Sequence, residues 1–156
     1  HAADLLSRKY HLIATNPPYL VRGKQSDRLR EYLTAYYPAG DADIATVFLK
    51  RFENFLELGG VHATVTPLNW YYLKSYQSLR EDLLSDSSVR LVAKVGSGAT
   101  AKASWDVLRA LAIVEKTPPL SDSVISGVEA PSPDEADRAN ELRTGIVLTA
   151  TVKQAM

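Results

Sequence analysis

No cysteine occurs anywhere in the chain, and this absence excludes disulfide bonds, thiolate metal ligands and thiol redox chemistry. Long hydrophobic runs are absent too, since no stretch approaches the ~18–20 apolar residues that a membrane-spanning helix needs. The first residues show no signal-peptide pattern. The three histidines, at positions 1, 11 and 62, lack the spacing of metal ligands. The sequence therefore predicts a cytoplasmic protein with no metal and no membrane contact.

A net charge is also missing, because 18 basic residues balance 18 acidic ones, whereas many nucleic-acid-binding domains are strongly basic. The charges are unevenly spread, however. Residues 8–30 contain one acid, Asp27, and six bases: Arg8, Lys9, Arg22, Lys24, Arg28 and Arg30. Such a cluster is typical of a surface that contacts a phosphate backbone. The same side chains could simply solvate a loop and a helix face, so both interpretations stay open.

The chain contains enough apolar residues to form one domain. It also contains one distinctive tetrapeptide. Its 156 residues, 46% of them hydrophobic, can bury a core. Asn-Pro-Pro-Tyr, residues 16–19, follows an apolar run at residues 11–15 that is typical of a short buried strand. Two successive prolines end the strand, remove two backbone donors and stiffen the turn. Ligands of open α/β sheets bind at this place, the carboxyl end of a strand.

The residue types of the tetrapeptide suit the binding of a planar amine. The side-chain carbonyl of Asn16 and the backbone carbonyl of Pro17 can accept the two hydrogens of an amino group. The ring of Tyr19 can stack on the flat group that carries the amine. A duller interpretation is that Asn16 caps a turn, because Asn before Pro is common in turns.

The tetrapeptide resembles the catalytic motif of S-adenosylmethionine-dependent amino-methyltransferases, most closely that of N6-adenine DNA methyltransferases of restriction and phage-resistance systems. Later segments follow in a similar order, which is also that of the large single-chain enzymes of the BREX type. They are Asp43-Ile-Ala-Thr-Val-Phe48, Leu58-Gly-Gly-Val61, Thr66-Pro-Leu-Asn-Trp70 and Val95-Gly-Ser-Gly-Ala99. The resemblance covers roughly residues 8–117, and it implies the C-terminal half of a methyltransferase catalytic domain.

This resemblance implies roles for residues of the catalytic turn. Asn16, Pro17, Pro18 and Tyr19 would be catalytic. Asn16, together with Phe48, would contact the methyl donor S-adenosylmethionine. Periodicity alone places Phe48 in the core of its helix, and one residue can serve both purposes.

The resemblance also implies contacts with a DNA substrate. Tyr19, Trp70, Thr100 and Lys24 would bind it, with the target adenine flipped out of the duplex onto Tyr19. The family usually has an aromatic residue at the position of Thr100, where stacking on a base contributes on the order of 1–3 kcal/mol. Base holding is therefore expected to be weaker here, and Trp105 is a further stacking candidate. Plain packing is an alternative role for Trp70.

The resemblance implies the α/β class, as a partial Rossmann-like S-adenosylmethionine-dependent methyltransferase fold, and the residue pattern predicts its individual elements. Apolar spacings of three and four predict a core-facing helix over residues 44–58, ended by Gly59-Gly60. The other expected helices cover residues 27–36, 75–84 and 134–142. Strands are expected over residues 11–16, 61–66, 89–95 and 107–114. We expect the sheet order first, second, fourth, third, with an antiparallel last pair and helices on both faces.

Proline-rich stretches divide the chain into three parts. Residues 1–117 would form the catalytic half, residues 118–133 a linker, and residues 134–156 the start of a following region. The first strand lacks the neighbour that a full sheet would place beside it. Its free edge is expected to support self-association.

No glycine-rich turn precedes the tetrapeptide in this sequence, so the chain by itself is expected to bind S-adenosylmethionine weakly or not at all. Two other functions stay open. One is methylation of rRNA or of a protein glutamine, although those relatives enter the next helix soon after the tetrapeptide. Here more than twenty residues, 20–43, intervene, which favours DNA. The other is a non-catalytic fragment with a structural or association role.

Overall fold

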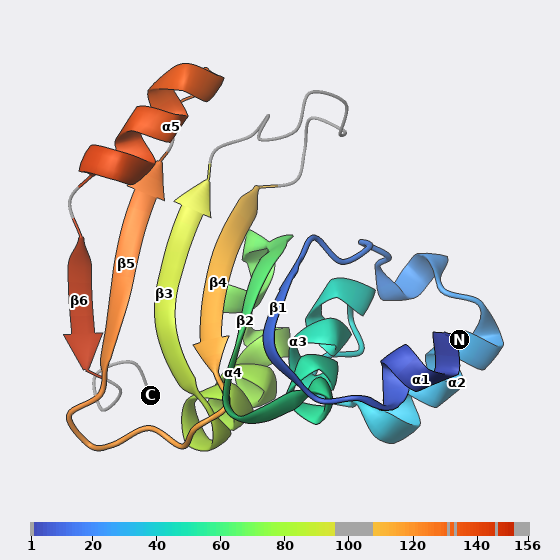
Figure 1. The fold of residues 1–156 in the computed structure, drawn as a ribbon. Coiled ribbons are helices and arrows are strands. Elements are labelled where there is room, and N and C mark those ends of the chain that lie inside the picture. Colours follow the sequence, from blue (N-terminus) through green and yellow to red (C-terminus); the bar gives the residue numbers. More distant parts are fainter. Residues whose placement is uncertain (1, 96–107, 131, 133, 146, 152–156) are drawn as a thin grey trace.

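A six-stranded sheet forms the centre of the computed structural model, which describes residues 2–95, 108–130, 132, 134–145 and 147–151 (Figure 1). The strands are β1 (Tyr10–Thr15), β2 (Leu56–Pro67), β3 (Ser88–Val95), β4 (Arg109–Glu115), β5 (Val124–Ala130) and β6 (Leu148–Thr151). They lie in the order β1-β2-β4-β3-β5-β6. β1 pairs parallel with β2, and β4 lies antiparallel between β2 and β3. The predicted order of the first four strands and their antiparallel last pair are therefore confirmed.

Five α-helices and three short 3-10 helices are described along with the strands. The α-helices are α1 (Ala2–Ser7), α2 (Asp27–Tyr36), α3 (Ile44–Phe55), α4 (Gln77–Asp86) and α5 (Glu135–Thr144). The 3-10 helices are η1 (Arg22–Lys24), η2 (Leu68–Tyr71) and η3 (Lys74–Tyr76). The predicted bounds of α2 are confirmed. The start of this helix is set by a neighbouring residue, since the hydroxyl of Ser26 accepts from the backbone N–H of Leu29. No described helix is both long and apolar enough to cross a membrane.

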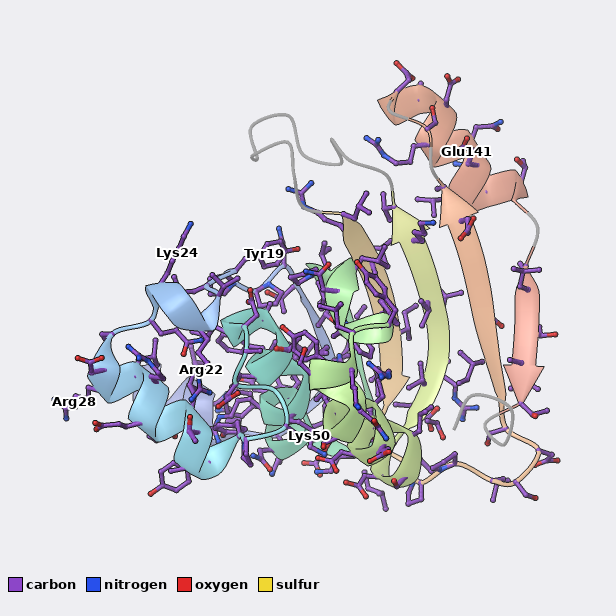
Figure 2. The ribbon with its side chains drawn as sticks, turned by 180° about the vertical axis from the view of Figure 1, so that it is seen from behind. Tyr19, Arg22, Lys24, Arg28, Lys50 and Glu141 are labelled. Atoms are coloured by element: carbon purple, nitrogen blue, oxygen red, sulfur yellow. The ribbon has the colours of Figure 1, made fainter. Side chains whose placement is uncertain are left out.

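Helices α3 and α4 lie on the same face of the sheet, in front of the strands in Figure 2. Their apolar side chains pack on β2, β3 and β4. The buried cluster consists of Leu49, Trp70, Tyr76, Leu79, Leu83, Leu84, Val89, Ala112 and Val114. On β2 the side chains of this face are polar as well as buried, since His62, Thr64 and Thr66 alternate along it. The core therefore sits between the sheet and these two helices.

The end of α3 differs from the prediction of a helix over residues 44–58. The helix ends at Phe55, and Leu56 is already extended and pairs with Tyr10 on β1. Gly59 and Gly60 lie inside β2, where Gly59 has a φ of 77° and the backbones of Glu57 and Tyr10 approach Gly60 closely. Strand β2 thus begins at Leu56, which pairs with β1, and includes three residues that helical periodicity assigned to α3.

The predicted linker over residues 118–133 is wrong where β5 lies. β5 pairs parallel with β3, from Leu91 opposite Ser126 to Val95 opposite Ala130. The expected tail contributes α5, which packs against β5, and β6, which pairs antiparallel with β5. The sheet therefore continues past residue 117, whereas the division of the chain into functional regions stays a prediction.

Strand β1 forms one edge of the sheet and is largely exposed. Its only partner among the described residues is β2. Leu12 is 64% exposed, and by register it shares with Val61 the sheet face that points away from His62 and α3. No described helix covers that face over β1, β2 and β4, and α5 packs only against β5. The prediction of helices on both faces is therefore met only in part.

Candidate active site at the carboxyl end of β1

The Asn-Pro-Pro-Tyr turn begins directly after Thr15, the last residue of β1. Thr15 pairs with Thr64 of the parallel strand β2, so the turn lies at the carboxyl edge of the sheet, as predicted. Asn16 and Pro18 are exposed and Pro17 is buried. Within the described part of the chain, the Asn16 side chain makes no hydrogen bond, which leaves its carbonyl free to accept one. The turn thus presents one amide to the solvent from a fixed backbone.

The segment that follows the tetrapeptide is fastened to the start of α3. The backbone N–H of Leu20 donates to Oδ1 of Asp43 (3.2 Å), and the same oxygen caps α3 by accepting from the N–H of Ala45 (2.9 Å). The carbonyl of Leu20 accepts from Ile44, and Arg22 donates to the carbonyl of Ala42 (2.8 Å). Because Asp43 is only 4% exposed, these bonds are shielded from water.

The buried side chain of Gln25 links the two ends of the 20–43 insertion. Its side-chain amide donates to the carbonyls of Leu20 and Asp41, both at 3.2 Å. The carboxylate of Asp41 in turn pairs with Arg22 and accepts from the hydroxyl of Thr34 (2.8 Å). The insertion is therefore a closed unit anchored beside the tetrapeptide. Sequence reasoning identified its length but not this anchor, which consists of contacts between residues far apart in the chain.

Tyr19 is half-buried, and its hydroxyl is buried. Burial raises the pKa of Tyr19, and the guanidinium of Arg109 beside the hydroxyl opposes that rise. Arg109 begins β4 and is 4% exposed. Sequence reasoning missed Arg109 as part of the site. The available signal was an arginine within a run of residues expected to form a central strand, where charged side chains are rare.

Phe48 lies on the side of α3 that faces α2. Its ring is half-buried, 5.4 Å from the ring of Phe52. It borders a half-open hollow of about 180 Å³ together with Tyr32, Leu33, Tyr37, Ile44, Val47 and Arg51. None of the tetrapeptide residues lines this hollow. The structure therefore does not bring Phe48 and Asn16 into one described cavity, and a shared donor site stays a prediction.

Trp70 is 3% exposed and belongs to the core cluster. Its indole N–H donates to the hydroxyl of Thr66 (2.9 Å), and its ring stacks on Tyr71 with centroids 3.9 Å apart. The cavity that it lines lies between α4 and strands β3 and β5, and contains none of the tetrapeptide residues. These contacts favour the packing role that was the alternative for Trp70.

The basic cluster is partly neutralised. Arg22 pairs with Asp41, and Arg30 pairs with Asp27 at 2.7 Å. Lys24 and Arg28 are exposed and make no ion pair with the described residues. In Figure 2 the side chain of Lys24 points outward from the molecule.

Two of the predicted substrate residues, Thr100 and Trp105, lie outside the described residues, as does the Gly96-Ser97-Gly98 loop. Within the described ranges, no group of three or more His, Asp or Glu side chains could hold a metal ion.

Comparison with known proteins supplies a family for this geometry. The family described as Eco57I restriction-modification methylase matches residues 3–99. The adenine-specific methyltransferase PglX of Lacticaseibacillus casei (strain Zhang) is 32% identical over 109 residues, which are 70% of this chain and 9% of that protein. The adenine-specific methyltransferase BrxX of Escherichia coli O9:H4 (strain HS) is 28% identical over 114 residues, 73% of this chain and 10% of that protein. The chain thus spans about a tenth of these relatives.

A solved structure of a type I restriction-modification system, studied for its assembly and conformational transition, has the same fold. It superposes with a TM-score of 0.73 at 19% identity, over 95% of this chain and 36% of that one. At this identity the likeness concerns the fold alone, and it confirms the Rossmann-like class.

Proposed function

Because the chain belongs to the Eco57I restriction-modification methylase family, we propose that it forms part of an enzyme that methylates the N6 amine of adenine in DNA. The observation that carries this proposal is the rigid tetrapeptide at the carboxyl edge of the sheet, with an exposed and unbonded Asn16 beside the half-exposed ring of Tyr19. The names of the relatives, adenine-specific methyltransferases, support the choice of base. The setting would be restriction-modification or phage defence.

The residues of the turn would act on the amine. The lone pair of the adenine N6 atom is delocalised into the ring, which makes the amine a poor nucleophile. Hydrogen bonds from the amine to Asn16 Oδ1 and to the carbonyl of Pro17 would draw the nitrogen toward tetrahedral geometry. Because these acceptors face the atom where positive charge develops, they would stabilise the transition state more than the ground state. Pro17 and Pro18 hold both acceptors in place, and Tyr19 would stack on the flipped base.

S-adenosylmethionine supplies an electrophilic methyl group when it is bound. The hollow at Phe48 fits part of such a donor, since a flat aromatic wall can receive an adenine ring. A hollow of about 180 Å³, lined by α2, Tyr37 and α3, offers no glycine-rich turn for the rest of the molecule. We therefore infer that other parts of a longer protein complete the donor site.

DNA would be contacted from the 20–43 insertion. Lys24 and Arg28 carry charges that no described carboxylate neutralises, and phosphate groups are suitable partners for them. The anchor formed by Gln25 and Asp43 would hold these cations at a fixed place beside the tetrapeptide.

A second candidate, an association role without catalysis, is favoured for the isolated chain by the open edge of β1. Methylation of rRNA or of protein glutamine is a further alternative.

The test is transfer of a labelled methyl group by the complete protein that contains this chain, offered unmethylated genomic DNA, rRNA and bulk protein in parallel. The proposal requires label in DNA, recovered as N6-methyladenine after digestion. Label only in RNA or protein, or in no substrate, would refute it.

A further inference from the structure

A second turn leaves the sheet beside the tetrapeptide. It follows β2 and consists of η2 and η3, residues 68–76. Because β1 and β2 are parallel, with Thr15 opposite Thr64, both turns begin at the same edge of the sheet from neighbouring strands (Figure 1). The exposed side chains of the second turn therefore lie at the edge where the substrate would approach.

Three of these exposed side chains could bind a ligand: Asn69, Tyr72 and Lys74. Tyr72 is 59% exposed, and its hydroxyl donates to Oδ1 of Asn69 (3.1 Å). The amide of Asn69 thus keeps its two N–H donors for another partner. Lys74 makes no ion pair with the described residues. The turn presents N–H donors, an aromatic ring and an unneutralised positive charge.

Arg80 of α4 fixes the backbone of this turn. Its Nη1 donates to the carbonyls of Trp70 (2.7 Å) and Leu73 (2.8 Å). The backbone N–H groups of Tyr72 (3.3 Å) and Leu73 (3.0 Å) donate to the carbonyl of Asn69. Because these bonds hold the backbone in place, the exposed side chains lose less freedom when a ligand binds.

Acidic residues are absent from this part of the sequence. Between Glu57 and Glu81 the chain contains no Asp or Glu, whereas it contains Lys74 and Arg80. A nucleotide matches such a surface, because its phosphate attracts a cation and accepts N–H bonds. Its base or sugar can pack on an aromatic ring. The charge and the polar groups of the turn therefore favour nucleic acid as the ligand.

We propose that Asn69, Tyr72 and Lys74 form a DNA-contact patch beside the target adenine, and that Arg80 is its positioning residue. The amide of Asn69 and the ammonium group of Lys74 would bind phosphate oxygens, and the ring of Tyr72 would pack on the neighbouring nucleotide. The proposal rests on the proposed function, since DNA is the substrate there.

Four variants of the complete protein test the patch: Tyr72→Ala, Lys74→Gln, Arg80→Ala and the double variant Arg80→Ala/Tyr72→Ala. Two matched controls change residues at the opposite edge of the sheet. Arg90→Gln removes an exposed charge at the start of β3, and Leu120→Ala truncates an exposed side chain between β4 and β5.

The ligand is a fragment of unmethylated genomic DNA that the wild type methylates. The measurements are its dissociation constant at several salt concentrations, the single-turnover rate at saturating DNA, and the thermal unfolding midpoint.

We expect Tyr72→Ala to weaken DNA binding roughly tenfold with no change in salt dependence, because stacking on a ring involves no counterion. Lys74→Gln should weaken binding and lower the slope of log affinity against log salt by about one, the effect of one lost phosphate contact. Both losses should appear in the dissociation constant rather than in the rate at saturating DNA. The two controls should bind like the wild type.

Arg80→Ala should also weaken DNA binding, since the turn loses its anchor. The double variant should lose less than the product of the two single losses, because Arg80 acts through Tyr72. A purely structural role of Arg80 would lower the unfolding midpoint and leave this coupling at zero. Tyr72→Ala and Lys74→Gln alter only exposed side chains, so they test the patch even if Arg80→Ala is unstable.

Wild-type DNA affinity in Tyr72→Ala and Lys74→Gln would overturn the patch and leave the proposed function intact. An unchanged salt slope in Lys74→Gln would overturn the phosphate contact, and losses that multiply in the double variant would overturn the role of Arg80. A wild-type protein that methylates only RNA or protein would instead refute the proposed function, and the DNA-contact patch with it.

Discussion

The backbone N–H of Leu20 donates to the carboxylate of Asp43 over 3.2 Å, and this bond joins the residue after the tetrapeptide to the N-cap of α3. One buried oxygen thereby serves two segments, because it also accepts from Ala45. The position of the candidate catalytic turn therefore depends on a helix cap more than twenty residues away in the sequence.

Replacing Asp43 with Ala should lower the free energy of unfolding by about 2–3 kcal/mol, since it removes a cap and leaves the N–H of Leu20 buried without a partner. Urea unfolding of the chain measures this. Asp134→Ala is the matched control: Asp134 caps α5 on the surface, so its loss should cost about 1 kcal/mol. Equal losses in both variants would show that the bond to Leu20 contributes nothing.

Asn16→Ala should lower methyl transfer by the complete protein about 10²–10³-fold, the usual effect of losing one preorganised polar group that acts on the transition state. The unfolding midpoint should stay unchanged, because Asn16 is exposed and bonds to no described residue. Donor binding should stay nearly intact although Asn16 would contact the donor, because Asn16 would act mainly on the amine as charge develops, so its loss appears in turnover. Tyr19→Ala should have a smaller effect.

The measurement for Asn16 is the single-turnover rate, with Asn140→Ala on the exposed surface of α5 as the control. If Asn16→Ala kept more than about a tenth of the rate, a role as amine acceptor would be untenable. The tetrapeptide would then be only a turn.

His62 should make the stability of the chain pH-dependent. It is 0% exposed, its two ring nitrogens have no hydrogen-bond partner among the described residues, and burial lowers its pKa to about 4. In the unfolded chain the pKa returns to its ordinary value of about 6.5. The unfolded state therefore binds more protons between these two values, and the free energy of unfolding falls as the pH falls from 6.5 to 4, by about 3 kcal/mol in all.

Urea unfolding between pH 4 and 7 tests this contribution. His62→Gln should flatten the curve in that window, whereas His11→Gln, on the exposed edge strand β1, should leave it unchanged. Identical slopes for the wild type and His62→Gln would mean that His62 takes up protons equally in the folded and unfolded chain, which would contradict the lowered pKa.

The isolated chain should bind S-adenosylmethionine with a dissociation constant above about 10 μM, which corresponds to an affinity weaker than −7 kcal/mol. The reason is that the hollow at Phe48 offers one aromatic wall and no glycine-rich turn. Calorimetric titration gives the value. Tighter binding would show that residues 1–156 contain a complete donor site.

The free edge of β1 should allow the isolated chain to associate. Sedimentation over a range of concentrations should show dimers or larger species that disappear in Leu12→Lys, because a charge on an edge strand opposes pairing. Leu120→Lys is the control, since Leu120 is similarly exposed (72% against 64% for Leu12) but lies outside β1. A strict monomer at every concentration would contradict the association and leave the fold unaffected.

Local signals in the sequence were sufficient for several elements. The bounds of α2 follow from Ser26 before it and Pro38 after it, both of which act within a few residues. The tetrapeptide stops β1 in the same local way, because proline cannot continue a strand ladder. The order of the first four strands came from the resemblance to a known family.

Features that depend on distant residues could not be read from local patterns. The residues of β5 were interpreted as linker because proline-rich stretches flank them on both sides, and they form a strand because β3 offers a pairing edge. Trp70 was predicted to bind substrate, but its bond to Thr66, its stacking on Tyr71 and its burial in the core cluster favour a packing role.

The sequence by itself determined the chemistry available at the turn: an amide, two rigid carbonyls and an aromatic ring in consecutive positions after a strand. These properties are covalent and local, so they hold wherever the turn lies. Only the tertiary structure decided what surrounds them, namely Asp43 at the end of an insertion and Arg109 at the start of a strand that is ninety residues downstream. Such neighbours are brought together by strand pairing and burial, which depend on the whole chain.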